Sequence, residues 1–515
     1  MNVFKKIIKA ILNRFVIISV LILIQFGLFF WTLQYFESYS TYVHAFALVL
    51  SYILILYILN KDELSTYKIP WIIIILVLPL AGSIAYLMFG SVVLPKRIVR
   101  KIQSHNDKIL SNLRKDEEVF EKIKEENTFA FGQANYISQS SKNCLYDNSE
   151  IKYFPIGEKM YESMLEELKK AKKYIFMEFF IISEGKMWDS IHEILKEKVK
   201  EGIEVRVMYD DVGSIKHMKN NFKKNLEKEG IKCCCFNPYR PIASVAHNNR
   251  DHRKLLIIDG EVGYTGGINL ADEYINEINK FGHWKDSGVL IKGESVNNML
   301  AMFLRSWDLY YKTKDQDFFV YFKEEHNKYE NSGYSLMFGD GPKPLDNEYI
   351  GENAYLNIIN QAKKNLYIMT PYFIVDHTMV NALTNASLRG VDVRIILPHI
   401  PDKKMIFMIS KSYYFQLIKK GVKIYEYTPG FIHSKMVLCD NEIAINGTIN
   451  FDYRSFVHHF ECACWMYKVD CIEEMYNDYY KTIEISEEKK LENIKKGNII
   501  KRVFLAFLRF FAPLL

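Results

Sequence analysis

The sequence predicts an α/β protein in which two similar α/β repeats form one unit with pseudo-twofold symmetry, preceded by N-terminal transmembrane helices. One observation is a pattern, H-x-K-x-x-x-x-D, that occurs twice in the chain. A second is an alternation of helix-like and strand-like segments in the same order in both halves. The third is a series of apolar stretches before residue 91, each close to the ~20 residues that a spanning helix needs.

The N-terminal region, residues 1–91, contains three apolar stretches, Phe15–Phe36, Tyr42–Leu59 and Ile69–Phe89. Basic residues precede the first stretch and follow the third, and each group predicts a cytoplasmic location. Three crossings would put the two groups of basic residues on opposite sides of the membrane, so both groups cannot then be cytoplasmic. Either the third stretch, which contains Pro70, Pro79 and Gly82, enters and returns on one side, or the N-terminus lies outside the cell. We expect a multi-pass protein of the bacterial cell membrane with the later residues in the cytoplasm.

The rest of the chain divides into a connector, two repeats, a linker and a tail. Residues 92–135 are rich in charged side chains and predict a helical connector. The first repeat spans 136–320, the second spans 346–485, and a Gly- and Pro-containing linker, 321–345, lies between them. In each repeat a helix (160–173 or 353–364) precedes an apolar strand, and two further helix–strand pairs follow. The helices of these pairs end at glycines, namely Gly202, Gly230, Gly390 and Gly421.

The C-terminal segment, residues 486–515, predicts a basic amphipathic helix. Lys501, Arg502 and Arg509 fall on one side of a helical projection, and large apolar residues fill the remainder. The segment is short for a membrane span, so we expect it to lie in the headgroup layer. Packing against the protein's own core is the alternative.

The repeated motif has the residue types that phosphodiester chemistry without a metal requires. Its two copies keep a constant offset (433 − 252 = 181) at five positions, counting a following glycine and asparagine. These positions are His252, Lys254, Asp259, Gly266 and Asn269, and His433, Lys435, Asp440, Gly447 and Asn450. One neutral imidazole can attack phosphorus, and a protonated one can give its proton to the leaving oxygen. Lysine and asparagine side chains can stabilise the negative charge that develops.

Short apolar strands follow both histidines, and residues two apart in a strand share a face. His252 and Lys254 are therefore expected to point the same way, as are His433 and Lys435. We expect the two half-sites to face each other across one cleft near a pseudo-twofold axis.

Composition favours a reducing compartment and no metal site. The eight cysteines show no C-x-x-C pair, and the net charge of +6 is modest for 515 residues. Asp210 and Asp211 resemble a paired-carboxylate metal site, but we expect them to cap a strand end or loop. No cofactor and no metal are expected.

From about Ile69 onward the chain resembles the phospholipase D superfamily, and within it the bacterial cardiolipin synthases. The strings NNRDHRKLLIIDG, YTGGIN, TPYFI, RGVDVRIILP and FIHSK…NGTINFDYRSFVHHFE carry the likeness. The resemblance implies transfer of a phosphatidyl group between two phosphatidylglycerol molecules, which gives cardiolipin and glycerol through a covalent phosphatidyl-histidine. Phosphatidylglycerol, other anionic phospholipids and the bilayer are the expected partners, with no nucleic acid.

The resemblance also implies roles for individual residues. His252 and His433 would be nucleophile and general acid, with the first copy more often the nucleophile, and Asp259 and Asp440 mainly structural. A carboxylate beyond each motif would orient its histidine, which points to Asp286 and Glu461. The sequence departs from the usual pattern at its second motif, since His458 and His459 stand where a Leu-Asn pair is common.

Several alternatives remain open at this point. Thr448 could bind a phosphoryl oxygen or support a turn, and Lys285 is expected to be a surface charge. A membrane phospholipase D, or a transferase with another alcohol acceptor, would use the same residues. A nuclease would need a broad basic surface and no membrane segments, and a noncatalytic scaffold would not need both His–Lys sets.

Overall fold

The computed structural model divides the chain into two units. Unit 1 comprises Met1–Val93, Pro238–Asn249 and Ala506–Leu515, and unit 2 comprises Leu94–Asn237 and Arg250–Leu505. The structure describes residues 41–90, 116–218, 221–238, 248–311, 318–323, 325–329, 333–343, 345–346, 348–493 and 499–514, with isolated positions 23, 27, 30, 31, 34, 35, 100, 109, 110 and 113.

A mixed sheet forms the first half of unit 2, with the strand order β1-β8-β6-β5-β2-β3-β4. Its strands are β1 (Ser149–Phe154), β2 (Tyr174–Phe179), β3 (Glu204–Asp210), β4 (Lys232–Phe236), β5 (Lys254–Ile258), β6 (Val262–Gly266) and β8 (Gly288–Gly293). Strands β2, β3 and β4 are parallel, and the other neighbours pair antiparallel.

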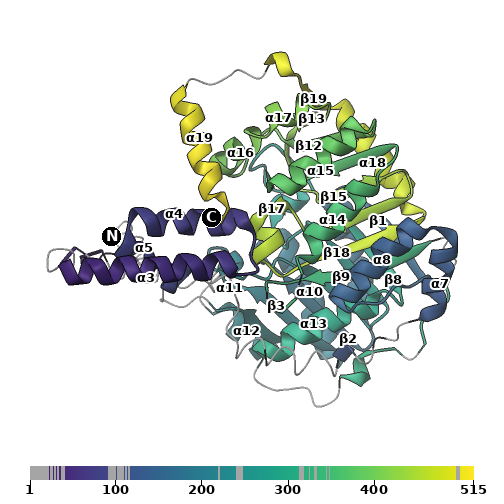
Figure 1. The fold of residues 1–515 in the computed structure, drawn as a ribbon. Coiled ribbons are helices and arrows are strands. Elements are labelled where there is room, and N and C mark those ends of the chain that lie inside the picture. The colour runs from purple at the N-terminus through teal and green to yellow at the C-terminus, as the bar shows by residue number, and fades with distance from the viewer. Residues whose placement is uncertain are drawn as a thin grey trace. The chain divides into compact units, whose positions relative to one another are not determined.

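The second half repeats this order in its own sheet, β9-β18-β16-β15-β10-β12-β13, and adds β19 at the edge. Its strands are β9 (Tyr334–Asp340), β10 (Asn365–Met369), β12 (Asp392–Pro398), β13 (Lys423–Tyr427), β15 (Met436–Cys439), β16 (Ile443–Gly447), β18 (Glu461–Tyr467) and β19 (Ser486–Lys489). The predicted α/β repeats are confirmed (Figure 1). Strand β9 falls within residues 321–345, which the sequence predicts to be a linker.

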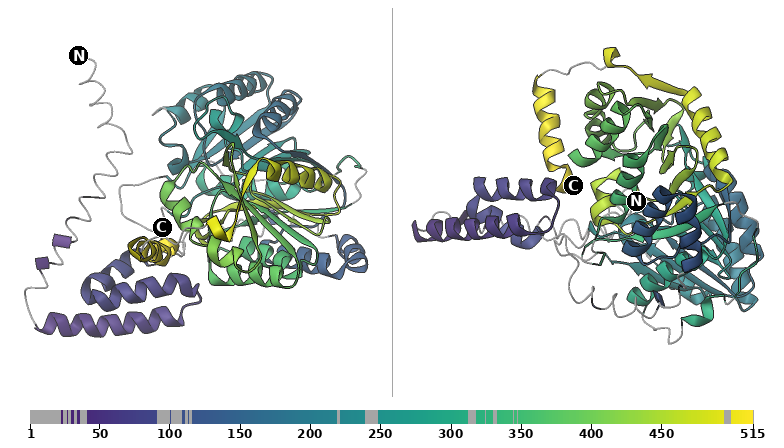
Figure 2. Two further views of the ribbon diagram at one scale, coloured as in Figure 1. Left: turned by 90° about the horizontal axis from the view of Figure 1, so that it is seen from above. Right: turned by 45° about the vertical axis from the view of Figure 1, so that its right-hand side comes forward.

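Helices follow the strands in the predicted order. The first half contains α9 (Gly157–Lys169), α10 (Lys186–Lys200) and α12 (Phe222–Lys228), and the second contains α14 (Ile350–Gln361), α15 (His377–Leu388), α16 (Lys404–Lys411) and α17 (Tyr414–Ile418). The blue-teal helices of the first half lie on one side of unit 2 and the green helices of the second on the other (Figure 2). The four glycines predicted to end helices have φ values of 85° to 95°, which favour glycine.

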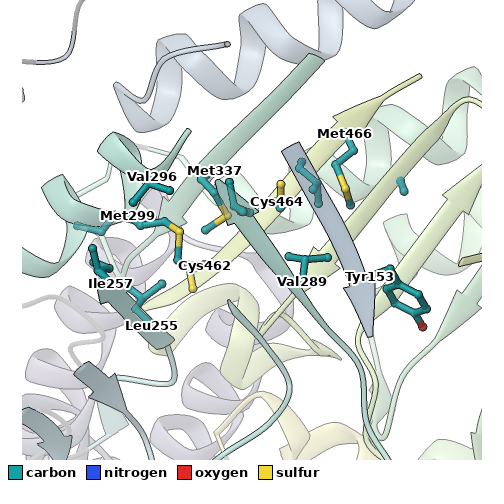
Figure 3. Packing of buried hydrophobic residues seen from close by; sticks show 14 of the residues in the cluster. Tyr153, Leu255, Ile257, Val289, Val296, Met299, Met337, Cys462, Cys464 and Met466 are labelled. Carbon is teal, nitrogen blue, oxygen red and sulfur yellow. The ribbon is translucent and has the colours of Figure 1, made fainter. Parts of the chain in front are cut away.

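The hydrophobic core between the two sheets joins the halves. Leu255 and Val289 of the first sheet and Met337 and Cys464 of the second belong to one buried cluster (Figure 3). Two long helices pack here, α13 (Val296–Tyr310) on the first sheet and on β9, and α18 (Cys471–Glu484) on the second sheet and on β1. Each half therefore contributes a helix that touches the other half, which fixes the two sheets relative to each other.

Smaller elements complete unit 2. The charged connector contains α7 (Glu117–Glu126) and α8 (Thr128–Ser141), and Asp210 caps the short α11 (Asp211–Ser214) by accepting from Val212 N and Gly213 N. Two-stranded sheets pair β11 (Phe373–Ile374) with β17 (Phe451–Asp452), and β7 (His283–Lys285) with β14 (Gly430–Ile432). All eight cysteines lie in the described part of the chain, and none forms a disulfide.

Unit 1 contains a bundle of apolar helices in which the third apolar stretch is broken. Helix α3 (Thr41–Asn60) covers the second stretch, but the third is divided into α4 (Ser65–Val77) and α5 (Pro79–Phe89). Leu78 takes a non-helical conformation because the residue before a proline is restricted. A Cβ atom at Gly82 would lie 2.6 Å from Ile74 O, so glycine permits the close approach of the two helices.

The predicted N-terminal transmembrane helices are not supported by this structure. Among the residues that it describes, no helix has the length and apolar character needed to cross a membrane. The third stretch fails because its two helices have 13 and 11 residues. The first stretch, Phe15–Phe36, lies mostly outside the described residues.

The C-terminal segment forms α19 (Ile499–Phe511) followed by the short turn η6 (Ala512–Leu514). Val503, Phe504 and Phe507 are exposed, whereas Leu508 is buried. Within unit 1, η6 contacts α4. The predicted segment 486–515 therefore contains a helix with both exposed and packed apolar residues, but its first residues form strand β19 and not helix.

Candidate active site

The first motif places its lysine at the first residue of β5 and its histidine two residues before that strand. The backbone N–H of His252 donates to Phe460 O (2.8 Å), which ties this position to the second half of the chain. Both side chains are buried, and Lys254 Nζ donates to His252 O at 2.5 Å. Lys254 Nζ and the His252 ring both lie next to the ring of Phe180, so the two side chains point the same way, as the strand spacing predicts.

The second motif repeats this arrangement before β15. The backbone N–H of His433 donates to Lys285 O (2.7 Å) in the first half, and Lys435 Nζ donates to His433 O. Both side chains are again buried. Each histidine is thus anchored by a backbone carbonyl from the opposite repeat.

The carboxylates that contact the histidines are exchanged between the halves. His252 Nδ1 lies 3.0 Å and 2.9 Å from the two carboxylate oxygens of Glu461. His433 Nδ1 lies 2.6 Å from Asp286 Oδ2. The expectation that each carboxylate orients the histidine of its own motif is therefore wrong. The cause is the close packing of the halves, which brings β18 to His252 and the residue after β7 to His433.

Burial and nearby charges from both halves lower the pKa values of the two histidines. Burial, reinforced by Lys254, Lys435 and His433, lowers the pKa of His252 well below its ordinary value. Burial and Lys435 lower the pKa of His433 to about 4, although Asp286 opposes this shift. Groups from both repeats therefore act on one another, as a shared site requires.

Burial also lowers the pKa values of the two motif lysines. Burial lowers the pKa of Lys254 to about 8 and that of Lys435 to about 7. Burial disfavours the charged ammonium, and a bound phosphate would restore it. Asp286 is ionised here because His433 and Lys435 overcome the effect of its burial and lower its pKa.

The motif aspartates lie at the far end of their strands and hold backbone in place. Asp259 accepts hydrogen bonds from the N–H groups of three residues, and Asp440 accepts three in the same way. The donors are Lys172, Lys173 and Tyr174 for Asp259, and Lys363, Lys364 and Asn365 for Asp440. Both aspartates have φ values near 55°, in the left-handed region. These contacts agree with the structural role that the resemblance implies.

The predicted phosphate-binding residues differ in how their side chains are used. Asn269 accepts from Ile181 N and donates to the Tyr274 hydroxyl, and Asn450 Nδ2 donates to Ser455 Oγ. Each amide nitrogen carries a second hydrogen, so phosphate binding by these asparagines stays a prediction.

Thr448 supports a carboxylate. Its hydroxyl donates to Glu461 Oε2 and accepts from Cys462 N at 3.0 Å. The structure therefore favours the supporting role over direct contact with a phosphoryl oxygen. In the first half Gly267 takes this place, and a Cβ atom there would lie 2.0 Å from Asp286 Oδ1.

Two features of the site were not predicted from the sequence. Lys285 is buried and ion-paired with Asp478 (2.8 Å), so its assignment as a surface charge is wrong. Ser287 Oγ and Ser434 Oγ, which come from different halves, lie 2.5 Å apart. Both serines adjoin assigned residues, but only the packing of the repeats reveals their contact.

His459 lies beside the first motif. Its ring centroid is 5.4 Å from that of His252, and its Nδ1 is 3.4 Å from Glu461 Oε1. Burial lowers the pKa of His459 to about 3, so the ring is neutral. His252, His459 and Glu461 form a group of three potential metal ligands. The unusual His458–His459 pair was the signal in the sequence, although no role could be assigned to it.

Comparisons with known proteins agree with this architecture. The family described as cardiolipin synthase, PLD-like domain, matches residues 164–307 and 355–482, one segment in each repeat. A phospholipase D–nuclease N-terminal family matches residues 49–91.

Curated relatives cover nearly the whole chain. A cardiolipin synthase of Halalkalibacterium halodurans is 32% identical over 98% of this chain and 100% of its own length. An uncharacterized protein of Streptococcus mutans is 41% identical over 90% of this chain and 99% of its own. A solved structure, the phosphatidylserine synthase of Haemophilus influenzae, shares the fold with a TM-score of 0.54 at 12% identity, covering 74% of this chain and 98% of its own. The chain therefore belongs to the cardiolipin synthase family with phospholipase D-like domains.

Proposed function

We propose that this protein is a cardiolipin synthase that joins two phosphatidylglycerol molecules and releases glycerol. The observation that carries the proposal is the exchanged pair of His–carboxylate contacts, His252–Glu461 and His433–Asp286, together with two buried lysines whose charges act on both histidines. Two imidazoles that share one anion-binding site can act as nucleophile and acid in the same reaction. Family membership supplies the lipid substrate class.

In the proposed mechanism His252 attacks the phosphorus of the first phosphatidylglycerol. Glu461 accepts a hydrogen bond from the Nδ1–H group of His252 and so keeps the proton on Nδ1, which leaves the lone pair of Nε2 free to form the bond to phosphorus. The bond to the glycerol headgroup breaks, and His433 protonates the departing oxygen. The product of this step is a phosphatidyl-histidine at His252.

A second phosphatidylglycerol completes the reaction. His433, now neutral, takes the proton of the incoming headgroup hydroxyl, and the oxygen attacks phosphorus and releases His252. The different surroundings of the two histidines favour this division of roles. Asp286 partly offsets the burial of His433, whereas the charges near His252 add to its burial and keep that ring neutral. The anionic substrate itself would raise the pKa of His433 towards the value that an acid needs.

The test is product analysis with purified enzyme and labelled phosphatidylglycerol as the sole lipid. Cardiolipin with an equal amount of glycerol is the expected outcome. Phosphatidic acid alone would instead indicate a phospholipase D. A transferase with another acceptor would give a new phospholipid only when that alcohol is added.

We also propose that unit 1 associates with the bilayer that contains the substrate. Its helices expose large apolar side chains, including Phe46, Tyr52 and Leu56 on α3 and Leu76 and Leu87 on α4 and α5. An exposed apolar surface of this extent is typical of a membrane or protein contact. The catalytic repeats would lie on the cytoplasmic side, and tags at residues 1 and 330 test this by their accessibility in intact cells. An external tag at 330 would contradict it.

The exposed apolar residues of α19 suggest that the tail contributes to the same association. Deleting residues 497–515 should reduce turnover of lipid in vesicles more than turnover of lipid dissolved in detergent. Equal losses in the two assays would favour packing of the tail on the protein itself.

A further inference from the structure

Three side chains beside the proposed nucleophile form a compact set of metal ligands. His252, His459 and Glu461 each offer one ligand atom, and these atoms lie within 4.8 Å of one another. Glu461 Oε1 is 3.0 Å from His252 Nδ1 and 3.4 Å from His459 Nδ1. Zinc bonds to nitrogen and oxygen of about 2.0–2.2 Å place tetrahedral ligands roughly 3.3–3.5 Å apart. The two distances to Glu461 are close to this spacing.

His459 provides an independent indication of a missing partner. It is 7% exposed, and neither ring nitrogen has a hydrogen-bond partner among the described residues. Buried polar atoms are nearly always hydrogen-bonded, so two such atoms on one ring call for an explanation. The ring faces the site, because it lies next to both His252 and Glu461.

This arrangement occurs in only one half of the described site. Glu461 and Asp286 are 175 positions apart, so the position that corresponds to His459 is Trp284, which is buried and cannot bind a metal. His433 is instead surrounded by aromatic rings, those of Tyr274, Trp284 and Phe431. Within the described part of the chain, the second histidine therefore has no equivalent group of ligands.

We propose that His252, His459 and Glu461 bind a divalent transition metal of the zinc type, and that binding inhibits the enzyme. Two imidazole nitrogens and one carboxylate oxygen suit zinc or cobalt and not magnesium or calcium. When protonated, Lys254 and Lys435 repel the metal cation. The metal should therefore bind more weakly than at a structural zinc site. Such a site would make the enzyme sensitive to excess zinc.

The inhibition follows from the tautomer of His252. Attack on phosphorus requires the hydrogen on Nδ1 and a free lone pair on Nε2. A metal bound at Nδ1 uses that lone pair and the Glu461 oxygen, and the ring hydrogen moves to Nε2. No proton is gained or lost by the neutral ring, but Nε2 can no longer attack. Inhibition rests on the proposed role of His252, whereas metal binding does not.

Metal binding is tested with cobalt(II), whose visible absorption reports coordination directly. The purified full-length protein in detergent should show a new absorption band on titration with cobalt chloride, and His459→Asn should remove it. The matched control is His458→Asn, which changes the neighbouring buried histidine and should keep the band. Thermal unfolding establishes that each variant is folded, and His459→Gln replaces His459→Asn if the latter is not. No band in the wild type, or an unchanged band in a folded His459 variant, would overturn the proposal.

Inhibition is tested with zinc chloride in the phosphatidylglycerol assay. Zinc should inhibit the wild type and EDTA should restore its activity, whereas His459→Asn should need at least tenfold more zinc. Equal zinc sensitivity of the wild type and this variant would refute inhibition through the site. The two proposals fail separately. A cobalt band without lipid turnover contradicts the proposed function, and lipid turnover without a cobalt band contradicts the metal site.

Discussion

The two half-sites share a motif but not their surroundings. His252 contacts both oxygens of Glu461, which is backed by the Thr448 hydroxyl, and has His459 as a neighbour. His433 contacts one oxygen of Asp286 at 2.6 Å, and Asp286 is backed by the N–H of Ser287. Glu461, the longer side chain, is thus supported by the Thr448 hydroxyl. Asp286, the shorter side chain, has Gly267 beside it, where a Cβ atom would not fit.

This difference shows how a duplicated unit can supply two distinct catalytic groups. The motif itself is identical in both copies, so it cannot decide which histidine attacks. The carboxylates come from the opposite repeats and do not keep the offset of 181, since 461 − 286 = 175. The local environments are therefore free to differ, and in the proposed mechanism this difference divides the roles of nucleophile and acid.

The largest expected effect is the loss of either histidine. His252→Ala and His433→Ala should each lower kcat by roughly 10³-fold or more, because nucleophilic attack is lost in one and general-acid catalysis, worth ~10²–10⁴-fold, in the other. The two variants should differ in the intermediate. With a phosphatidyl donor that has a good leaving group, His433→Ala should accumulate a lipid adduct detectable by mass spectrometry, and His252→Ala should not.

An adduct on His433 in the His252 variant would reverse the assigned roles. Substantial turnover in either variant would refute the two-histidine mechanism.

The next largest effect should come from the exchanged carboxylates. Glu461→Gln and Asp286→Asn each replace a charge-assisted hydrogen bond worth about 1.5–3 kcal/mol, or roughly 10- to 150-fold in rate. Glu461→Gln should slow adduct formation at His252. Asp286→Asn should instead slow the step that depends on His433, so a donor with a good leaving group should largely rescue its adduct formation.

Single-turnover measurement of adduct formation distinguishes these variants. If a donor with a good leaving group restored adduct formation in Glu461→Gln and not in Asp286→Asn, each carboxylate would serve the histidine of its own repeat.

A smaller effect is expected from pH through the lysines. The pKa values of about 7 for Lys435 and about 8 for Lys254 belong to the enzyme without substrate. As pH rises through these values the lysines lose their protons and attract phosphate less, so kcat/KM should fall on the alkaline side. Lys435→Arg should shift the part of this fall that occurs near pH 7 to higher pH, because the guanidinium stays charged.

The matched variant Lys254→Arg should instead shift the part of the fall that occurs near pH 8. A pH profile that is flat across this range in the wild type would show that the two lysines stay protonated in the free enzyme.

The smallest effect should come from Thr448→Val. Loss of one hydrogen bond to Glu461, worth about 0.5–1.5 kcal/mol, predicts a fall in kcat of roughly 2- to 12-fold. Thr448→Ser keeps the hydroxyl and should retain most activity. If Thr448→Val acted as strongly as Glu461→Gln, the hydroxyl would contact the substrate directly.

Much of the fold could be predicted because local patterns determine it. The helix–strand order, the helix-ending glycines and the short strand that follows each histidine depend on neighbours in sequence, and the structure contains each of them. The division of the apolar stretch 69–89 into two helices could not be predicted from hydropathy, because a run of apolar residues does not show that Leu78 and Pro79 interrupt the helix.

The chain by itself determined that there are two His–Lys sets, related by one offset, on two similar repeats. Only the tertiary structure decided their partners. Which carboxylate reaches His252 depends on how β18 packs against the first repeat, and Lys285 is buried because α18 of the second repeat brings Asp478 to it. Contacts between residues about 150 to 210 positions apart are set by the packing of two sheets, and no periodicity in the sequence encodes that packing.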